Sequence, residues 1–139
     1  MTDDPLPPVL ERMLSLWNGA PIDPAELYAP ICVENGTSSF TPDDIARDIA
    51  HLRGALADLA FTVESWTSAG PLFLLRLVAE GLHTGTLETP LGKAEASGLR
   101  LRMSGLEVFE VRDDRITSVW LSWNWSAAYA KLGATLPAR

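Results

Sequence analysis

The chain has little cysteine, histidine or positive charge, and each shortage excludes a class of site. Its one cysteine, Cys32, has no partner for an internal disulfide, and with only two histidines, His51 and His83, a typical metal site is not expected. The 18 acidic residues against 11 basic ones give a net charge of −7, which disfavours nucleic acid and anionic membrane surfaces as partners. No apolar run approaches the ~20 residues that span a bilayer. We therefore expect no metal, no nucleic acid and no membrane.

The chain does have the size and composition of one folded domain. It contains 139 residues, of which 47% are hydrophobic and 21% are charged, unlike a disordered chain and enough for a core. The acidic, proline-rich start over residues 1–8 is the opposite of a signal peptide and predicts a flexible lead-in. We expect a soluble, cytoplasmic protein with a single domain over residues 9–135.

Helical signals fill the N-terminal half of the chain. Apolar residues recur at helical spacing over residues 9–17, and Asn18-Gly19 ends that run. Asp23-Pro24 begins a second, short helix. Thr41-Pro42 begins a third, whose row of apolar residues continues to Leu59. The sequence therefore predicts three helices in this half.

Strand signals follow, with period-two alternation and many β-branched or aromatic residues. The predicted segments are strands at 61–67, 72–83, 99–112 and 116–125, a loop at 84–96 and a helical turn at 126–132. Residues 72–83 are apolar on both faces except for Arg76 and Glu80, which suits a central strand. Helices first and a long antiparallel sheet afterwards predict an α+β fold.

A two-residue turn at Asp113-Asp114 would decide which side chains share a face of the sheet. The predicted pairs are Val111 with Ile116, Glu107 with Trp120, Gly105 with Ser122 and Met103 with Asn124. The opposite face would then be an apolar patch made of Leu106, Val108, Val119, Leu121 and Trp123. Such a patch is too continuous for the surface of a free monomer. We therefore expect a homodimer formed through the outer face of the sheet.

Glu107 is the only charged residue on an otherwise apolar face. A buried carboxylate must be paired, raised in pKa or open to a cavity, because burial of an isolated charge is costly. A carboxyl group with a raised pKa in an apolar pocket is a candidate general base or acid. The alternatives are a solvated strand edge or an ion pair with Arg76, and Arg76 could also orient a catalytic Glu107.

His83 lies at a predicted strand end, where histidine anchors a loop more often than it acts as a base. Both interpretations stay open. The sequence contains no glycine-rich phosphate loop and no Gly-x-Ser-x-Gly motif, so a phosphate-binding loop is not expected and a serine hydrolase site is disfavoured.

Short motifs over nearly the whole chain resemble the SnoaL-like polyketide cyclases. They are Gly81-Leu82-His83-Thr84-Gly85, Pro90-Leu91-Gly92-Lys93, Ser104-Gly105-Leu106-Glu107-Val108-Phe109, and Asp114 to Trp120 followed by Asn124 and Gly133. The resemblance implies the cone-shaped α+β fold of the nuclear transport factor 2-like superfamily, in which N-terminal helices pack into a curved sheet around an apolar pocket. It also implies dimerisation through the sheet, and an acidic residue that removes a proton next to a carbonyl without metal or cofactor.

One departure from the family changes the expected mechanism. The usual catalytic aspartate falls on Asn124, and an amide cannot act as a carboxylate base, although it can donate to an enolate oxygen. Either the base has moved to Glu107 or the protein is a non-catalytic ligand-binding or dimerisation module. In the enzyme hypothesis, Glu107 and Asn124 are catalytic, and residues 84–96 are a candidate lid. The hydrophobic, carbonyl-bearing substrate would then contact Arg76, His83, Phe109, Trp120 and Ser122.

Overall fold

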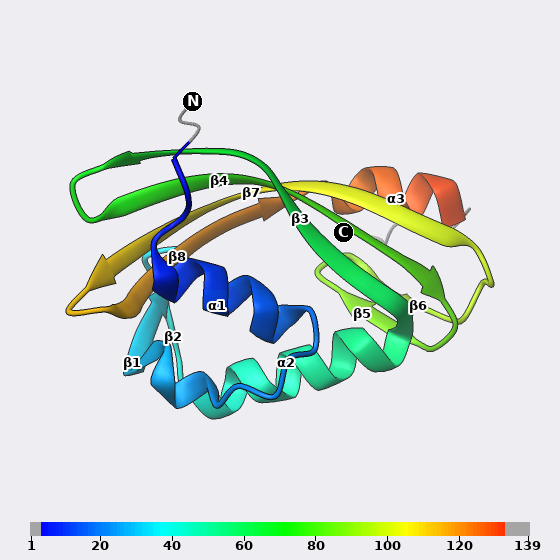
Figure 1. The fold of residues 1–139 in the computed structure, drawn as a ribbon. Helices are drawn as coiled ribbons and strands as arrows, with labels where there is room; N and C mark the ends of the chain where they lie inside the picture. Colours follow the sequence, from blue (N-terminus) through cyan, green and yellow to red (C-terminus); the bar gives the residue numbers. More distant parts are fainter. Residues whose placement is uncertain (1–3, 133–139) are drawn as a thin grey trace.

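The computed structural model describes residues 4–132, which form a curved, six-stranded mixed sheet with helices packed against it (Figure 1). The helices are α1 (Pro8–Trp17), the 3₁₀ helix η1 (Pro24–Glu26), α2 (Pro42–Ala55) and α3 (Trp125–Leu132). The strands are β1 (Tyr28–Glu34), β2 (Ser38–Phe40), β3 (Leu56–Ala69), β4 (Leu72–His83), β5 (Leu87–Thr89), β6 (Gly92–Ala94), β7 (Arg100–Arg112) and β8 (Arg115–Trp123). The order in the large sheet is β2-β1-β8-β7-β4-β3. The predicted α+β class is confirmed.

The N-terminal helices begin where their capping residues predict. Thr41 and Asp44 form a reciprocal capping box at the start of α2. Asp23 accepts a hydrogen bond from the Ala25 amide, but the element behind it is only one 3₁₀ turn. Helix α2 ends at Ala55, so the prediction that it continues to Leu59 is wrong. Leu59 belongs to β3, which is irregular between residues 57 and 60, and this irregularity leaves its side chain buried. The helix-like spacing of apolar residues therefore continues past the end of α2 without a helix.

Three features of the strands differ from prediction. Strands β1 and β2 were not expected, because β1 contains Pro30 and lacks clean alternation. Strand β1 pairs with β8 in parallel, so the large sheet is mixed and not wholly antiparallel. Residues 84–96 are not a plain loop, since they contain the β5–β6 hairpin.

The β7–β8 hairpin decides which residues reach the interior. Its two-residue turn is confirmed, because Asp113 and Asp114 both have the positive φ of a type I′ turn. Val111 pairs with Ile116 as predicted, but Thr117 is then an extra residue that forms a bulge. Beyond the bulge, Glu107 pairs with Leu121 rather than with Trp120, so the predicted register is wrong there.

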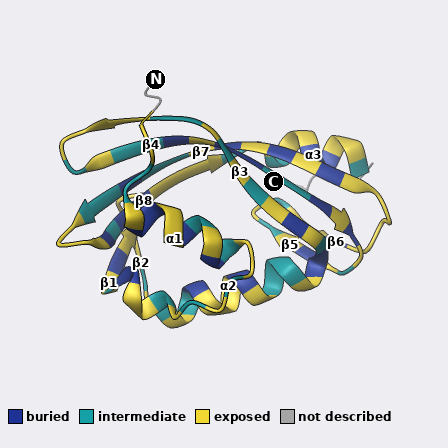
Figure 2. Cartoon of the chain, viewed as in Figure 1, coloured by how far each residue is buried: buried dark blue, intermediate teal, exposed yellow. Residues whose placement is uncertain are grey.

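The main core lies between α1, α2 and the face of the sheet that they cover, here called the inner face (Figures 1 and 2). Its fully buried side chains include Leu10 from α1, Leu75 from β4, Phe109 from β7 and Ile116 from β8. The opposite, outer face has more exposed residues. A second, smaller cluster includes Leu56, Leu59, Leu87 and Leu101, with Trp125 and Leu132 of α3 packed against it. The curved sheet thus has one face buried against helices, and Glu107 belongs to that face.

Candidate functional site

Glu107 is a partly buried carboxyl group on the inner face of β7. Its Oε2 accepts a hydrogen bond of 2.7 Å from Nε1 of Trp123, which lies on β8. None of the ion pairs among residues 4–132 includes Glu107. Leu121, its cross-strand neighbour, is 37% exposed, so solvent reaches this part of the inner face. The carboxyl group is therefore partly buried, accepts one hydrogen bond from a neutral donor and lies beside a side chain that solvent reaches.

Burial raises the pKa of Glu107 to about 7, because removal of the carboxylate from water disfavours its charged form. The hydrogen bond from Trp123 opposes this rise, and the negative charge of Glu34 adds to it. Glu34 lies on β1, where it pairs with Val119 of the neighbouring strand β8. A carboxyl group that titrates near neutral pH can both accept and donate a proton under cellular conditions.

Aromatic rings pack around the donor of this hydrogen bond. Phe61 contacts Trp123 edge-on, with ring centroids 6.0 Å apart, and Trp17 contacts Phe61 in the same way at 5.8 Å. Trp17 Nε1 in turn donates to the Tyr28 hydroxyl at 3.0 Å, and burial raises the pKa of Tyr28. Trp123 was predicted on the opposite face. The bulge at Thr117, which no sequence pattern announced, turns it inward.

The other predicted site residues do not gather around Glu107. Arg76 pairs with Glu64 at 3.7 Å, so the predicted Arg76–Glu107 ion pair is not formed. Arg76, Ser122 and Asn124 together line a hollow of about 580 Å³ on the outer side of the sheet, the outer hollow, which Gly105 and Trp123 also line. Asn124 Oδ1 accepts a hydrogen bond from the Ala127 amide and so caps the start of α3. The predicted site is therefore divided between the two faces of the sheet.

Phe109 and Trp120 also lie on different faces. Phe109 is only 1% exposed and belongs to the core. Trp120 is 39% exposed and pairs with Val108, so its ring lies on the outer face. The bulge thus turns Trp120 and Ser122 away from Glu107.

His83, the last residue of β4, is fully buried, and its ring connects this strand to the segment between β6 and β7. Its Nδ1 lies 2.8 Å from Ser97 Oγ, and its Nε2 lies 3.2 Å from the Ala94 carbonyl oxygen. Both ring nitrogens are therefore occupied by the segment that leads from β6 to β7. This geometry is that of a histidine that anchors a loop.

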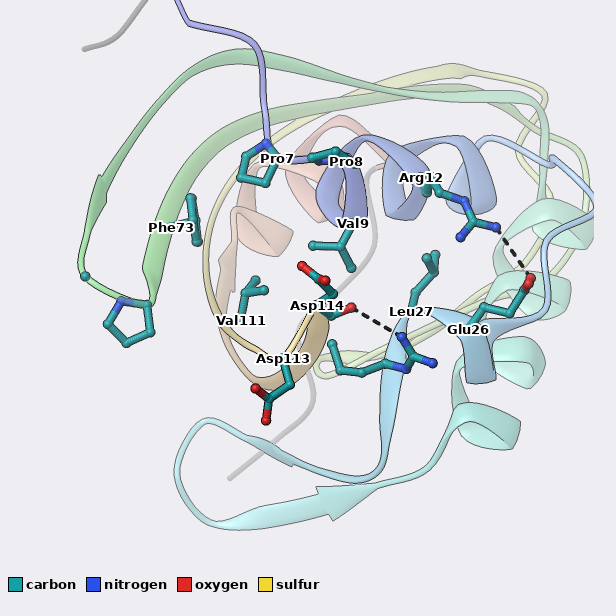
Figure 3. A pocket seen from close by; sticks show the side chains of 13 residues that line it. Pro7, Pro8, Val9, Arg12, Glu26, Leu27, Phe73, Val111, Asp113 and Asp114 are labelled. Atoms are coloured by element: carbon teal, nitrogen blue, oxygen red, sulfur yellow. Dashed lines mark hydrogen bonds and ion pairs between the residues drawn. The ribbon is translucent and has the colours of Figure 1, made fainter.

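A second hollow, of about 530 Å³, opens beside the start of α1 (Figure 3). Val9, Phe73 and Val111 supply apolar surface, while Arg12 forms an ion pair with Glu26 at its rim. Arg115 donates to the Asp114 carbonyl oxygen at 3.5 Å, beside the hairpin turn. Glu107 lines neither hollow.

Within residues 4–132, no three or more His, Cys, Asp or Glu side chains are grouped so that they could hold a metal ion. No helix in the same range is long and apolar enough to cross a membrane.

The fold resembles several solved structures. TsrD from Streptomyces laurentii is 21% identical over 91% of this chain and 93% of its own, with a TM-score of 0.78. A SnoaL-like polyketide cyclase from Agrobacterium tumefaciens is 16% identical over 90% of this chain and 95% of its own, with a TM-score of 0.71. A protein with a ketosteroid isomerase-like fold from Catenulispora acidiphila, in complex with trimethylamine, is 17% identical over 94% of this chain and 96% of its own, with a TM-score of 0.69.

At these identities the likeness concerns the fold. No match was found among curated proteins. The family model for SnoaL-like polyketide cyclases matches residues 8–132, nearly all of the described structure. The chain therefore belongs to the SnoaL-like polyketide cyclase family.

Proposed function

We propose that the protein is a cofactor-independent acid–base enzyme in which Glu107 removes a proton next to the carbonyl group of a hydrophobic small molecule. The observation that carries this proposal is the partly buried Glu107, which no cation of the described residues neutralises and whose pKa is raised to about 7. Such a group is a base matched to neutral pH. Membership of a family of polyketide cyclases supports the substrate class.

The substrate would approach Glu107 from the open edge of the inner face. Leu121 is exposed beside Glu107, and it offers apolar contact for a hydrophobic ligand. Arg76 and Asn124 line the outer hollow, so we do not assign them to the substrate oxygen.

The test is deuterium incorporation into cyclic ketones and polyketide-like β-dicarbonyl compounds in heavy water, followed by mass spectrometry. We expect exchange above background with the wild type and none with Glu107→Gln, which keeps the shape of the side chain but removes the base. Glu110→Gln is the matched control, because Glu110 lies on the same strand and bonds to Thr117. Full exchange by Glu107→Gln would remove Glu107 from the reaction.

A second candidate is a non-catalytic module that binds a small apolar ligand. The observation that favours it is Asn124, which stands where the family has its catalytic aspartate and which caps α3 here. Ketones that raise the melting temperature of the protein without exchanging deuterium would support this candidate over the enzyme.

We also propose a homodimer formed through the outer face. Its support is an apolar patch that consists of Leu74, Leu106, Val108 and Trp120 on three adjacent strands. Leu106 is 49% exposed, and such a patch indicates an interaction surface. Sedimentation velocity is expected to show twice the 15.1 kDa chain mass. Leu106→Glu should restore the monomer, whereas Leu99→Glu, which changes an exposed loop residue, should not. A wild type that sediments only as the monomer would contradict the proposal.

A further inference from the structure

We propose that Trp123 is a positioning residue for Glu107: its indole N–H holds one carboxylate oxygen and leaves the other as the atom that reacts. This inference rests on the proposed function for the reaction itself, but not for the geometry. Trp123 Nε1 donates to Oε2 at 2.7 Å. Among the described residues, Oε1 has no hydrogen-bond or ion-pair partner. A substrate proton would therefore be taken up by Oε1.

Gly105 makes this placement of the indole ring sterically feasible. It pairs directly with Trp123 across the β7–β8 hairpin. A Cβ atom at position 105 would lie under 3.0 Å from three atoms of the Trp123 ring. The ring therefore occupies the space that any side chain at position 105 would need. With nothing between them, the indole lies against β7, and its N–H reaches Glu107 two residues along that strand.

Phe61 packs against the same indole ring and is itself fixed by Asn18. Phe61 meets Trp123 edge-on, at an interplanar angle of 77°. Asn18 Nδ2 donates to the Phe61 carbonyl oxygen at 3.1 Å, and the Phe61 amide donates to Asn18 Oδ1 at 2.7 Å. These two bonds join the end of α1 to β3. The indole is thus held by the bare backbone of Gly105 and by a ring whose backbone is anchored, so its N–H has a defined direction.

A positioned N–H donor has a consequence that simple packing lacks. It stabilises the ionised carboxylate and so lowers the pKa of Glu107 against the effect of burial. Removal of the donor should therefore make Glu107 a stronger proton binder, with a roughly tenfold smaller acid dissociation constant. A purely structural tryptophan would leave that constant unchanged.

The test is an NMR titration of the Glu107 side-chain carboxyl carbon in the wild type, Trp123→Phe and Gly105→Ala. Trp123→Phe removes the N–H and keeps an aromatic ring, while Gly105→Ala keeps the indole but displaces it. We expect the titration midpoint to move to higher pH in both variants. Trp120→Phe is the matched control, because it makes the same change on the outer face, and its midpoint should equal that of the wild type. Unchanged midpoints in both inner-face variants would overturn the proposal.

A second measurement needs only the wild type and Glu107→Gln, and it covers the case in which an inner-face variant does not fold. The Trp123 indole N–H signal should titrate with the same midpoint as Glu107, and it should lose that dependence in Glu107→Gln. A flat signal between about pH 5 and pH 9 would overturn the proposal. Neither measurement requires turnover, so a failure of deuterium exchange would count against the proposed function and leave this test intact. Where exchange occurs, its pH profile should shift upward in Trp123→Phe.

Discussion

The inner and outer faces of the large sheet both carry polar residues close to apolar ones, but these polar residues differ in whether they have partners. On the outer face, Arg76 has Glu64 as an ion-pair partner and Asn124 caps a helix. On the inner face, Glu107 has one neutral donor and no cation, and its pKa is raised. The polar groups of the outer face are thus satisfied by a charged partner or by a hydrogen bond. The group that we propose to react is instead a carboxyl group that folding leaves without a counter-charge among the described residues.

The largest expected difference between the faces is the free energy of unfolding that is lost when an aromatic side chain is replaced by alanine. Phe109→Ala should lower the free energy of unfolding by about 3–5 kcal/mol, because Phe109 is 1% exposed. Trp120→Ala on the outer face should cost less than about 2 kcal/mol in the monomer, because its ring is 39% exposed. Urea unfolding at low protein concentration measures both. Equal losses would show that the two faces do not differ as described.

The next effect is the pH dependence of stability that Glu107 contributes. The unfolded chain ionises this carboxyl near its ordinary pKa of 4.5, whereas the folded chain retains the proton until about pH 7. The free energy of unfolding should therefore fall as pH rises through this interval, by up to about 3 kcal/mol, and stay constant above it. Urea titrations of the wild type at several pH values should show this fall, and Glu107→Gln should lack it.

Glu110 provides the control, because its contribution to stability changes with pH in the opposite direction to that of Glu107. Hydrogen bonds from Thr117 and Arg112 lower the pKa of Glu110, so its contribution is lost as pH falls towards the acid range. Glu110→Gln should lower stability near neutral pH, and its difference from the wild type should disappear as the pH falls into the acid range. A wild-type curve that is flat between pH 4.5 and pH 7 would contradict the assigned state of Glu107.

Asn124 should act on stability and not on chemistry. Asn124→Ala removes the cap of α3 and should cost about 1 kcal/mol. Asn124→Asp keeps a capping oxygen and restores the residue type of the family. Because the side chain lies in the outer hollow, we expect no gain in deuterium exchange. A clear gain would bring position 124 into the reaction.

The smallest expected effect concerns the Arg76–Glu64 pair. Both side chains are exposed, and their charged atoms are 3.7 Å apart. Arg76→Met should therefore change the free energy of unfolding by less than about 1 kcal/mol, and the change should shrink at high salt. A salt-independent loss of several kcal/mol would mean that Arg76 has a partner in the buried part of the molecule.

Local sequence signals predicted the parts of the fold that depend on neighbouring residues. Helix α2 starts at its capping box, and the turn at Asp113-Asp114 forms as expected, because each is determined by contacts within a few residues. The unusual position of Glu107 was also visible, since a single charge on an apolar face is a local pattern.

The remaining features depend on contacts distant in sequence. Strand β1 is stabilised by parallel pairing with β8, which begins about eighty residues later in the chain. The bulge at Thr117 follows no pattern of residue types, yet its hydroxyl donates to the Glu110 carboxylate and fixes the extra residue. For this reason the sequence could identify Glu107 but could not identify Trp123 as its neighbour.

In this protein the number of residues between the hairpin turn and the rest of β8 matters as well as their identity, because it decides which face of the sheet each later side chain occupies. One amino acid more between Asp114 and Val119, in a hairpin that keeps a single bulged residue, would shift the pairing of the rest of β8 by one, so Trp120 and Ser122 would point inward and Trp123 would reach the surface. A single-codon insertion would thereby exchange the lining of the interior for the lining of the exterior without altering any other side chain. Proteins of this family with identical strand motifs but different spacing after the turn would then present different chemical groups to a ligand.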